Sequence, residues 1–344
     1  MNQPATIETV AQLDDVMTTP SSALIEDLRR IEGDLLVLGV AGKMGPTLAV
    51  LAKRAFAEAG KDNRVIGVAR FSRGDLRGRL ESAGVQTIAA DLLAPTVLDR
   101  LPEVPNVIFL VGQKFGSTGN EPLTWAMNVF LPGLVADRFR QSRIVALSTG
   151  NVYPFTPVDS GGPDETAPVG PVGEYAQSCL GRERMFQYFS GLHGTPTALI
   201  RLNYAIDLRY GVLLDIATRV QAGTPIDLSM GHVNVIWQGD ANEAILRSLL
   251  LTSSPPLILN LTGPGVLSVR ELAQGLGRRL GREPVFTGSE AATALLSNAG
   301  EYVRRLGPPR VSVERMLDWV AHWVRIGGET LNKPTHYDAR DGKF

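Results

Sequence analysis

The sequence predicts an α/β fold, a doubly wound parallel sheet followed by a smaller C-terminal α/β lobe. Between residues 34 and 203, near-continuous apolar runs alternate with helical patterns, which is typical of a parallel sheet covered on both faces. A glycine-rich turn follows the first apolar run, and the elements become shorter beyond residue 204. We therefore expect a helical extension at 1–33, the sheet domain at 34–203, mainly a substrate-binding lobe at 204–326, of which about 232–261 returns to the sheet, and a polar tail at 327–344.

Composition excludes several classes of protein. The 344 residues are 44% hydrophobic with a net charge of −1, so neither nucleic acid nor an anionic membrane is an expected partner. No apolar run reaches the roughly 18 residues of a membrane span, and the N-terminal residues lack a secretory signal pattern. Cys179 is the only cysteine and the four histidines are scattered, so neither a disulfide nor a metal site is expected. These features predict a cytoplasmic protein.

The elements of the sheet domain follow in order. Ser21 is a suitable cap for a short helix over 21–31. Apolar runs predict strands at 34–39, 64–70, 85–90, 106–112, 143–148 and 195–201. Helical patterns lie between them, at 46–60, 74–82, 96–101, 121–141 and 174–192. Pro132 and Gly133 predict a kink or break in the helix at 121–141.

The second half of the chain has shorter elements. Helices are predicted at 210–222, 240–251, 268–280 and 312–325, and strands at 233–237 and 257–261. Residues 327–344 show no periodicity, so no element is predicted there.

The glycine-rich turn points to a nucleotide. Gly39, Gly42 and Gly45 recur at three-residue spacing, with Lys43 and Met44 between the last two and Pro46 opening the next helix. A strand, such a turn and a helix N-terminus form the Rossmann-type cradle for a dinucleotide pyrophosphate, because backbone N–H groups and the helix dipole face the anion. Lys43 lacks the preceding glycine and following Ser or Thr of a P-loop, which excludes that motif.

The residue after the second strand bears on which dinucleotide binds. An NAD site has an acid there for the ribose hydroxyls, whereas this chain has Ala69 and then Arg70. A guanidinium group suits a 2′-phosphate, and Lys43 could add charge, so we expect NADP, with NAD as the possible alternative. Arg70 could instead be a solvated residue at the strand end.

Further motifs carry a resemblance to a known family. Ser148-Thr149-Gly150 ends the fifth strand, and Glu174-Tyr175-Ala-Gln-Ser178-Cys179 opens the next long helix. With the glycine turn, Asp91-Leu92, Asn128, Arg201-Leu-Asn203, Gly239-Asp240 and Asn260-Leu-Thr-Gly263, they resemble the extended short-chain dehydrogenase/reductase family, the NAD-dependent epimerase/dehydratase group. The resemblance runs from about residue 34 to residue 325. It implies that Tyr175 is the acid/base, that Thr149 holds the substrate oxygen, and that Asp91, Leu92, Val111 and position 179 lie around the cofactor.

Position 179 departs from the family pattern. The family has a lysine four residues after the tyrosine, where this chain has Cys179. A cation about 4 Å from a phenol lowers its pKa by about one to three units, and a neutral thiol cannot do so. Lys114, just past the fourth strand, is the first candidate substitute, and Arg182, on the same helix face as Tyr175, is the second. Cys179 itself is expected to be a small buried apolar residue, a reactive thiol being the alternative.

The smaller lobe departs as well. Family members acting on sugar nucleotides usually carry an Arg-Asp pair where this chain has Val233 and Asn234. We therefore expect an NAD(P)-dependent oxidoreductase or epimerase of a small sugar, polyol or sugar acid. The alternatives are a nucleotide-sugar epimerase or dehydratase, and a dinucleotide-binding regulator without turnover. The expected substrate-binding residues are Asn151, Asn203, Arg209 and Trp237, although Trp237 could equally be a core residue.

The sequence also bears on the oligomeric state. In the family two long helices from each subunit pair, and the helices at 121–141 and 174–192 are the equivalents here. Their apolar residues, Met127, Phe130, Leu134, Leu180, Met185 and Phe186, predict a homodimer.

Overall fold

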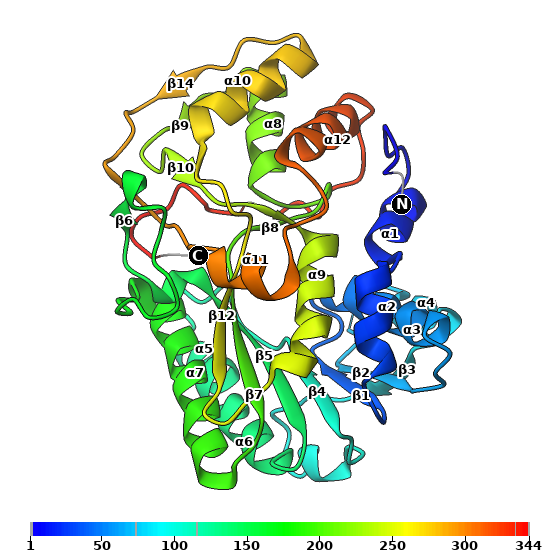
Figure 1. The fold of residues 1–344 in the computed structure, drawn as a ribbon. Helices are drawn as coiled ribbons and strands as arrows, with labels where there is room; N and C mark the ends of the chain where they lie inside the picture. Colours follow the sequence, from blue (N-terminus) through cyan, green and yellow to red (C-terminus); the bar gives the residue numbers. More distant parts are fainter. Residues whose placement is uncertain (1–2, 73, 115, 334, 343–344) are drawn as a thin grey trace.

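The computed structural model describes residues 3–72, 74–114, 116–333 and 335–342, and it confirms the predicted fold class (Figure 1). Seven strands form a parallel sheet in the order β12-β7-β5-β4-β1-β2-β3. The order reverses between β1 and β4, and ligands of such sheets bind at this switch point. The strands are β1 (Leu35–Leu38), β2 (Val65–Ala69), β3 (Gln86–Ala89), β4 (Asn106–Phe109), β5 (Arg143–Thr149), β7 (Thr197–Leu202) and β12 (Leu257–Leu261).

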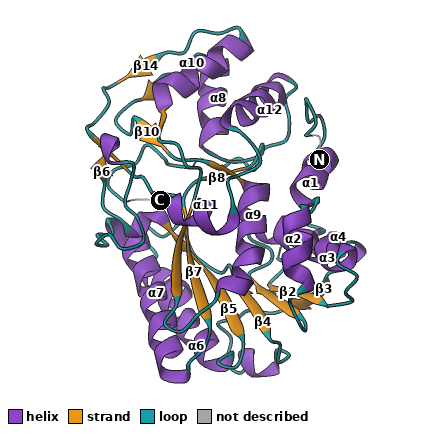
Figure 2. Cartoon of the chain, in the orientation of Figure 1, coloured by secondary structure: helices purple, strands orange, loops and turns teal. Residues whose placement is uncertain are grey.

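Helices cover both faces of the sheet (Figure 2). Side chains alternate along a strand, so Leu35 and Val37 of β1 face one layer and Leu36 and Leu38 the other. The first layer contains α2 (Ser22–Arg29), α3 (Gly45–Glu58), α4 (Leu76–Ser82) and α9 (Gln238–Arg247). The second contains α6 (Leu131–Arg138) and α7 (Gly173–His193), with α5 (Glu121–Trp125) beside them. Burial on both faces explains why the strands are apolar throughout.

The smaller lobe packs three helices around a second core. These are α8 (Val212–Ala222), α10 (Val269–Leu280) and α12 (Val313–Arg325). Trp237 and Trp319 meet in this core with ring centroids 5.1 Å apart. Short strand pairs complete the chain: β6 (Thr156–Pro157) with β15 (Thr293–Ala294), β8 (Ala205–Ile206) with β11 (Ile236–Trp237), β9 (Ile226–Asp227) with β14 (Phe286–Thr287), and β10 (His232–Val233) with β13 (Leu267–Ser268).

The break predicted from Pro132 and Gly133 in the helix at 121–141 is present. The helix is divided into α5, a π-helical turn (Ala126–Phe130) and α6, because Pro132 lacks the N–H that a regular helix would use. Other elements differ from prediction. The strand expected at 233–237 is two strands that pair with different partners. Residues 96–101 form only a 3₁₀ turn, Leu98–Arg100, and α11 (Gly300–Leu306) was not predicted. No helix in the described part of the chain is long and apolar enough to cross a membrane.

Both ends of the chain are more ordered than expected. The extension contains α1 (Val10–Thr18), which Thr9 and Gln12 cap reciprocally, in addition to α2. α1 packs on α3, and its Leu13 side chain enters the core of the smaller lobe. After α12, residues 327–333 and 335–342 run back between the lobe and the sheet (red in Figure 1). Tyr337 is buried there, so this polar segment is docked on the protein.

Candidate active site

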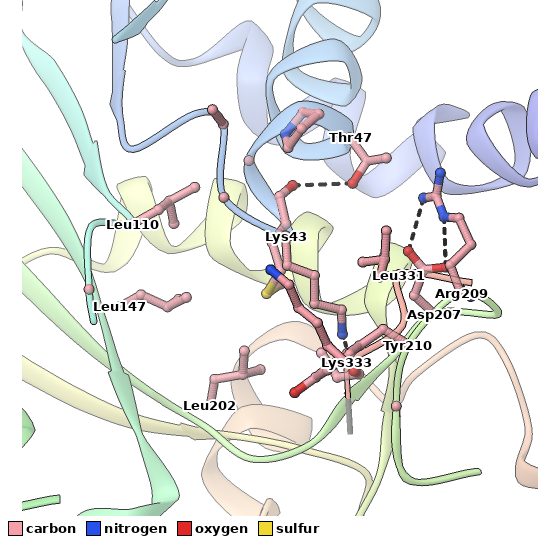
Figure 3. Close-up of a pocket in the computed structure, with 18 of the residues that line it drawn as sticks. Lys43, Thr47, Leu110, Leu147, Leu202, Asp207, Arg209, Tyr210, Leu331 and Lys333 are labelled. Carbon is pink, nitrogen blue, oxygen red and sulfur yellow. Dashed lines mark hydrogen bonds and ion pairs between the residues drawn. The ribbon is translucent and has the colours of Figure 1, made fainter. Parts of the chain in front are cut away.

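A cavity of about 900 Å³ lies at the carboxyl ends of the central strands, between the sheet and the smaller lobe. The glycine turn, the ends of β4, β5 and β7, and the loop before α8 form most of its wall. α1 and the C-terminal segment close the remainder, through Asp14 and Asp15 of the helix and through Leu331, Lys333 and Thr335 of the segment. Figure 3 shows Lys43 extended into this space, with Tyr210 and Lys333 near its end.

The glycine turn fits a dinucleotide pyrophosphate. Gly39 has a φ of +86°, which a residue with a side chain rarely adopts, and a Cβ on Gly45 would lie 2.4 Å from the Val40 carbonyl oxygen. Met44 caps α3 without a side-chain hydrogen bond, so no side chain covers the N–H groups of the first turn. Backbone donors and the helix dipole therefore remain directed at the cavity, as an anion requires.

Thr149 and Tyr175 lie together in the cavity wall. Thr149 ends β5, and Tyr175 occupies the first turn of α7. Burial raises the pKa of the Tyr175 phenol well above its usual value, whereas a hydrogen bond with Thr149 acts to lower it. Tyr175 also hydrogen-bonds Cys179, whose own pKa is raised by burial. The phenol is thus a protonated group next to a hydroxyl, as a proton donor to a substrate oxygen would be.

Two cations approach this pair. Arg182 donates to the Leu147 carbonyl and to Asn128 Oδ1, both at 2.7 Å, and its charge acts to lower the pKa of Tyr175. Lys114 Nζ lies 3.4 Å from the Thr335 carbonyl oxygen. Burial lowers the pKa of Lys114 to about 8, although Cys179 acts to raise it. Both residues predicted as sources of positive charge therefore reach the cavity, Arg182 toward Tyr175 and Lys114 toward Cys179.

A buried network fixes the strand and helix that carry the pair. Glu183 of α7 accepts hydrogen bonds from Arg201 at 3.0 and 2.7 Å and from Ser148 at 2.5 Å. Arg201 also donates to the Tyr153 hydroxyl at 2.7 Å. Since Ser148 precedes Thr149 and Glu183 lies on the helix of Tyr175, this network sets the relative position of the two site residues.

Lys43 reaches the opposite wall of the cavity. Its ammonium group donates to the Ala205 carbonyl at 2.6 Å and lies 4.3 Å from the centre of the Tyr210 ring. Burial lowers the pKa of Lys43 to about 7, and the nearby charge of Lys114 lowers it further, against the effect of Asp207. Beside it, Arg209 pairs with Asp207 at 2.9 Å and with Asp14 at 3.2 Å.

Comparison with known protein families finds one match for this sequence. A model of the NAD-dependent epimerase/dehydratase family matches residues 35–206, half of the chain. The chain belongs to this family. No curated protein sequence matches it.

Solved structures with this fold have low sequence identity to this chain. MoeE5 in complex with UDP-glucose and NAD has a TM-score of 0.68 and 19% identity over 86% of this chain and 99% of that one. UDP-glucuronic acid 4-epimerase from Bacillus cereus in complex with NAD has a TM-score of 0.70 and 16% identity, over 85% and 96%. DesIV, the dTDP-glucose 4,6-dehydratase from Streptomyces venezuelae with NAD and TYD bound, has a TM-score of 0.71 and 19% identity, over 85% and 97%.

The predicted site residues of this family member fall into two groups. Gly42, Lys43, Met44, Gly45, Lys114, Asn151, Asn203 and Arg209 all line the cavity beside Thr149 and Tyr175. The remaining cofactor residues lie outside it: Arg70 and Asp91 are exposed, Leu92, Val111 and Cys179 are buried, and Gly39 lies at the base of the turn.

One expectation for the substrate pocket is wrong. Trp237 is 1% exposed and packs in the core against Trp319, so its ring cannot contact a ligand in the cavity. Asn234, at the position of the family's Arg-Asp pair, is also buried. It donates to the Gly265 carbonyl at 2.7 Å and accepts from Ser297 N–H at 2.9 Å, which makes it structural.

The sequence did not predict some of the residues that line the cavity. Asp14 and Asp15 of α1 and Lys333 of the C-terminal segment gave no sequence signal, because only the docking of distant segments brings them to the cavity.

Proposed function

We propose that the protein binds NAD(P) in this cavity and acts as an epimerase or dehydratase of an activated, anionic sugar, with a nucleotide sugar as the first substrate class to test. The observation that carries the proposal is the pairing of Thr149 and Tyr175 in one cavity with the glycine turn. Family membership and the nucleotide sugars bound by structural neighbours support it.

The residues of the chain have separable roles in this proposal. The dinucleotide supplies hydride transfer to and from a carbinol carbon. Thr149 orients the substrate oxygen by a hydrogen bond, and Tyr175 exchanges a proton with that oxygen. Because the pKa of Tyr175 is raised by burial, the phenol is protonated at neutral pH, and Arg182 favours its ionisation. The N–H groups of the first turn of α3 hold the pyrophosphate.

The charge of the cavity favours an anionic substrate over a neutral sugar. Among its described lining residues, seven are lysine or arginine and three are aspartate. The small neutral sugar or polyol expected from the sequence fits this lining less well than a nucleotide sugar does, because the excess positive charge would remain uncompensated.

The preferred form of the cofactor is proposed separately. No acid follows β2, and Arg70, the first residue after this strand, is exposed and offers a guanidinium group for a 2′-phosphate. NADP should therefore bind about 10- to 100-fold more tightly than NAD, the range of a charge-assisted hydrogen bond. Calorimetric titration of both forms, repeated on Arg70→Ala, measures this; equal affinities in the wild-type protein would contradict it.

Turnover is tested with a substrate panel. Purified protein with NAD or NADP is incubated with UDP-glucose, UDP-glucuronic acid and dTDP-glucose, in parallel with free sugars and sugar acids, and products are identified by NMR. Thr149→Ala and Tyr175→Phe should reduce turnover, about 10²-fold or more for Tyr175→Phe, and should keep cofactor binding. Tyr188→Phe, which changes an exposed tyrosine on the same helix, should retain turnover. Turnover of a free sugar alone would refute the assigned substrate class.

A second candidate is a regulator that binds the dinucleotide without turnover. The raised pKa of Tyr175, next to a buried thiol at position 179, favours it. Cofactor binding in calorimetry without product from any substrate in the panel would support this candidate over the enzyme.

A further inference from the structure

Three lysines from distant parts of the chain face the same end of the cavity. Lys43 comes from the glycine turn, Lys114 from the segment after β4, and Lys333 from the C-terminal segment. Lys114 Nζ lies 3.4 Å from the carbonyl of Thr335, two residues beyond Lys333, which brings these segments together. Lys43 extends toward Lys333 (Figure 3), and its charge interacts with that of Lys114.

The carboxylates nearby are engaged by other groups. Asp207 accepts hydrogen bonds from the Arg209 side chain at 3.2 and 2.9 Å, and Arg209 also pairs with Asp14. Asp215 accepts from the backbone N–H and the hydroxyl of Thr335 at 2.8 and 2.5 Å. The ammonium group of Lys43 contacts the Ala205 carbonyl oxygen and the Tyr210 ring, which are both neutral. Positive charge therefore exceeds negative charge at this end of the cavity.

This cluster lies close to the proposed site of proton transfer. Lys114 interacts electrostatically with Cys179, and Cys179 hydrogen-bonds Tyr175. Lys43 and Lys114 repel each other and burial lowers the pKa of both, although the charge of Asp215 acts to raise both values. An anionic group bound by Lys114 would therefore lie on the side of the cavity that holds Cys179 and Tyr175.

We propose that Lys43, Lys114 and Lys333 form a subsite for an anionic group, a carboxylate or a phosphate, that the substrate carries on or next to its reacting ring. This inference rests on the proposed function and deepens it, because it assigns a charge to the sugar itself. A nucleotide diphosphate is separated from the reacting ring carbon by the sugar, so the cluster selects among sugars within a class. Charge-assisted bonds from ammonium groups favour the anionic member by about 10- to 100-fold.

Paired ligands test the subsite in the full-length protein with NADH or NADPH bound. UDP-glucuronic acid is compared with UDP-glucose, and glucose 6-phosphate with glucose, by calorimetry. The wild-type protein should bind the anionic member of at least one pair 10-fold or more tightly. The pair that responds distinguishes a ring carboxylate on a nucleotide sugar from a phosphate on a free sugar.

Substitutions test whether the three lysines cause the preference for the anionic ligand. Lys43→Met and Lys333→Met should each reduce affinity for the anionic ligand about 10-fold, and Lys333→Met should leave affinity for the neutral ligand unchanged. Lys53→Met, on α3 outside the cavity, is the matched control. Lys333 is exposed, so its replacement should not disturb folding.

The outcomes separate the two proposals. Failure to bind either reduced cofactor refutes the proposed function. Cofactor binding with equal affinities within both pairs, no binding of any ligand, or a preference that persists in both lysine variants overturns the subsite.

Discussion

Replacing Glu183 with alanine should lower the free energy of unfolding by about 3–5 kcal/mol, because it leaves the guanidinium group of Arg201 buried without its counter-ion. The side chains of Glu183 and Arg201 are 0% and 3% exposed, and two hydrogen bonds join them. Ser148 loses its acceptor in the same variant. An unfolding entropy of about 2.1 cal/mol/K per residue gives about 0.7 kcal/mol/K for the whole chain, so the melting temperature should fall by about 4–7 °C.

The contribution of the Glu183–Arg201 pair is measured as the change in melting temperature, with thermal unfolding monitored by circular dichroism. Glu314→Ala is the control, because Glu314 pairs with Arg279 at 2.6 Å but is 76% exposed, and an exposed pair contributes about 0–1 kcal/mol. A double variant, Glu183→Leu with Arg201→Met, removes both charges and should recover part of the loss. If Glu183→Ala lowers the melting temperature no more than Glu314→Ala does, the argument from burial is wrong.

Three further predictions concern catalysis, charge and assembly. Tyr175→Phe should reduce turnover about 10²-fold or more while Cys179→Ala retains most of it, and steady-state rates that show the reverse would indicate thiol chemistry. Burial lowers the pKa of Lys43 to about 7, so the unfolded chain binds one more proton than the folded chain between pH 7 and about 10.5, and stability rises over that range. Lys43→Met should therefore raise the melting temperature most at or below pH 7. A gain in melting temperature that does not shrink by pH 10 would contradict the argument from burial. Phe130 and Leu134 of the second helical layer are 59% and 40% exposed, so sedimentation at micromolar concentration should show a dimer that Phe130→Asp dissociates, and a monomeric wild-type protein would refute the predicted pairing.

Prediction from sequence succeeded where the signal is local. β12 has the predicted bounds, and α10 and α12 begin one residue after the predicted Ser268 and Ser312. The reason is visible in the caps, since each serine hydroxyl accepts a backbone N–H three residues later. The glycine turn was likewise readable, because a strand, three glycines and a helix are contiguous in the chain.

The failures have a different physical origin. The ring of Trp237 suits a sugar face and a hydrophobic core equally well, and only its packing on Trp319 decides between them. Lys333 lies in a segment without periodicity, whose docking depends on long-range contacts such as the ion pair of Asp338 with Arg219 at 3.1 Å. Sequence periodicity reports which face of an element is buried, but not which distant segment covers it.

Two side chains, Lys114 and Arg182, are candidates for the positive charge near Tyr175. A lysine is expected at position 179 from the family pattern, and a buried thiol cannot favour the ionised phenol. Burial lowers the pKa of Lys114 to about 8, so its charge is lost above that pH, and it acts on Cys179. Arg182 is held by two hydrogen bonds at 2.7 Å, and its charge acts directly on Tyr175. We therefore infer that Arg182, one turn of α7 beyond Cys179, supplies the positive charge for proton transfer.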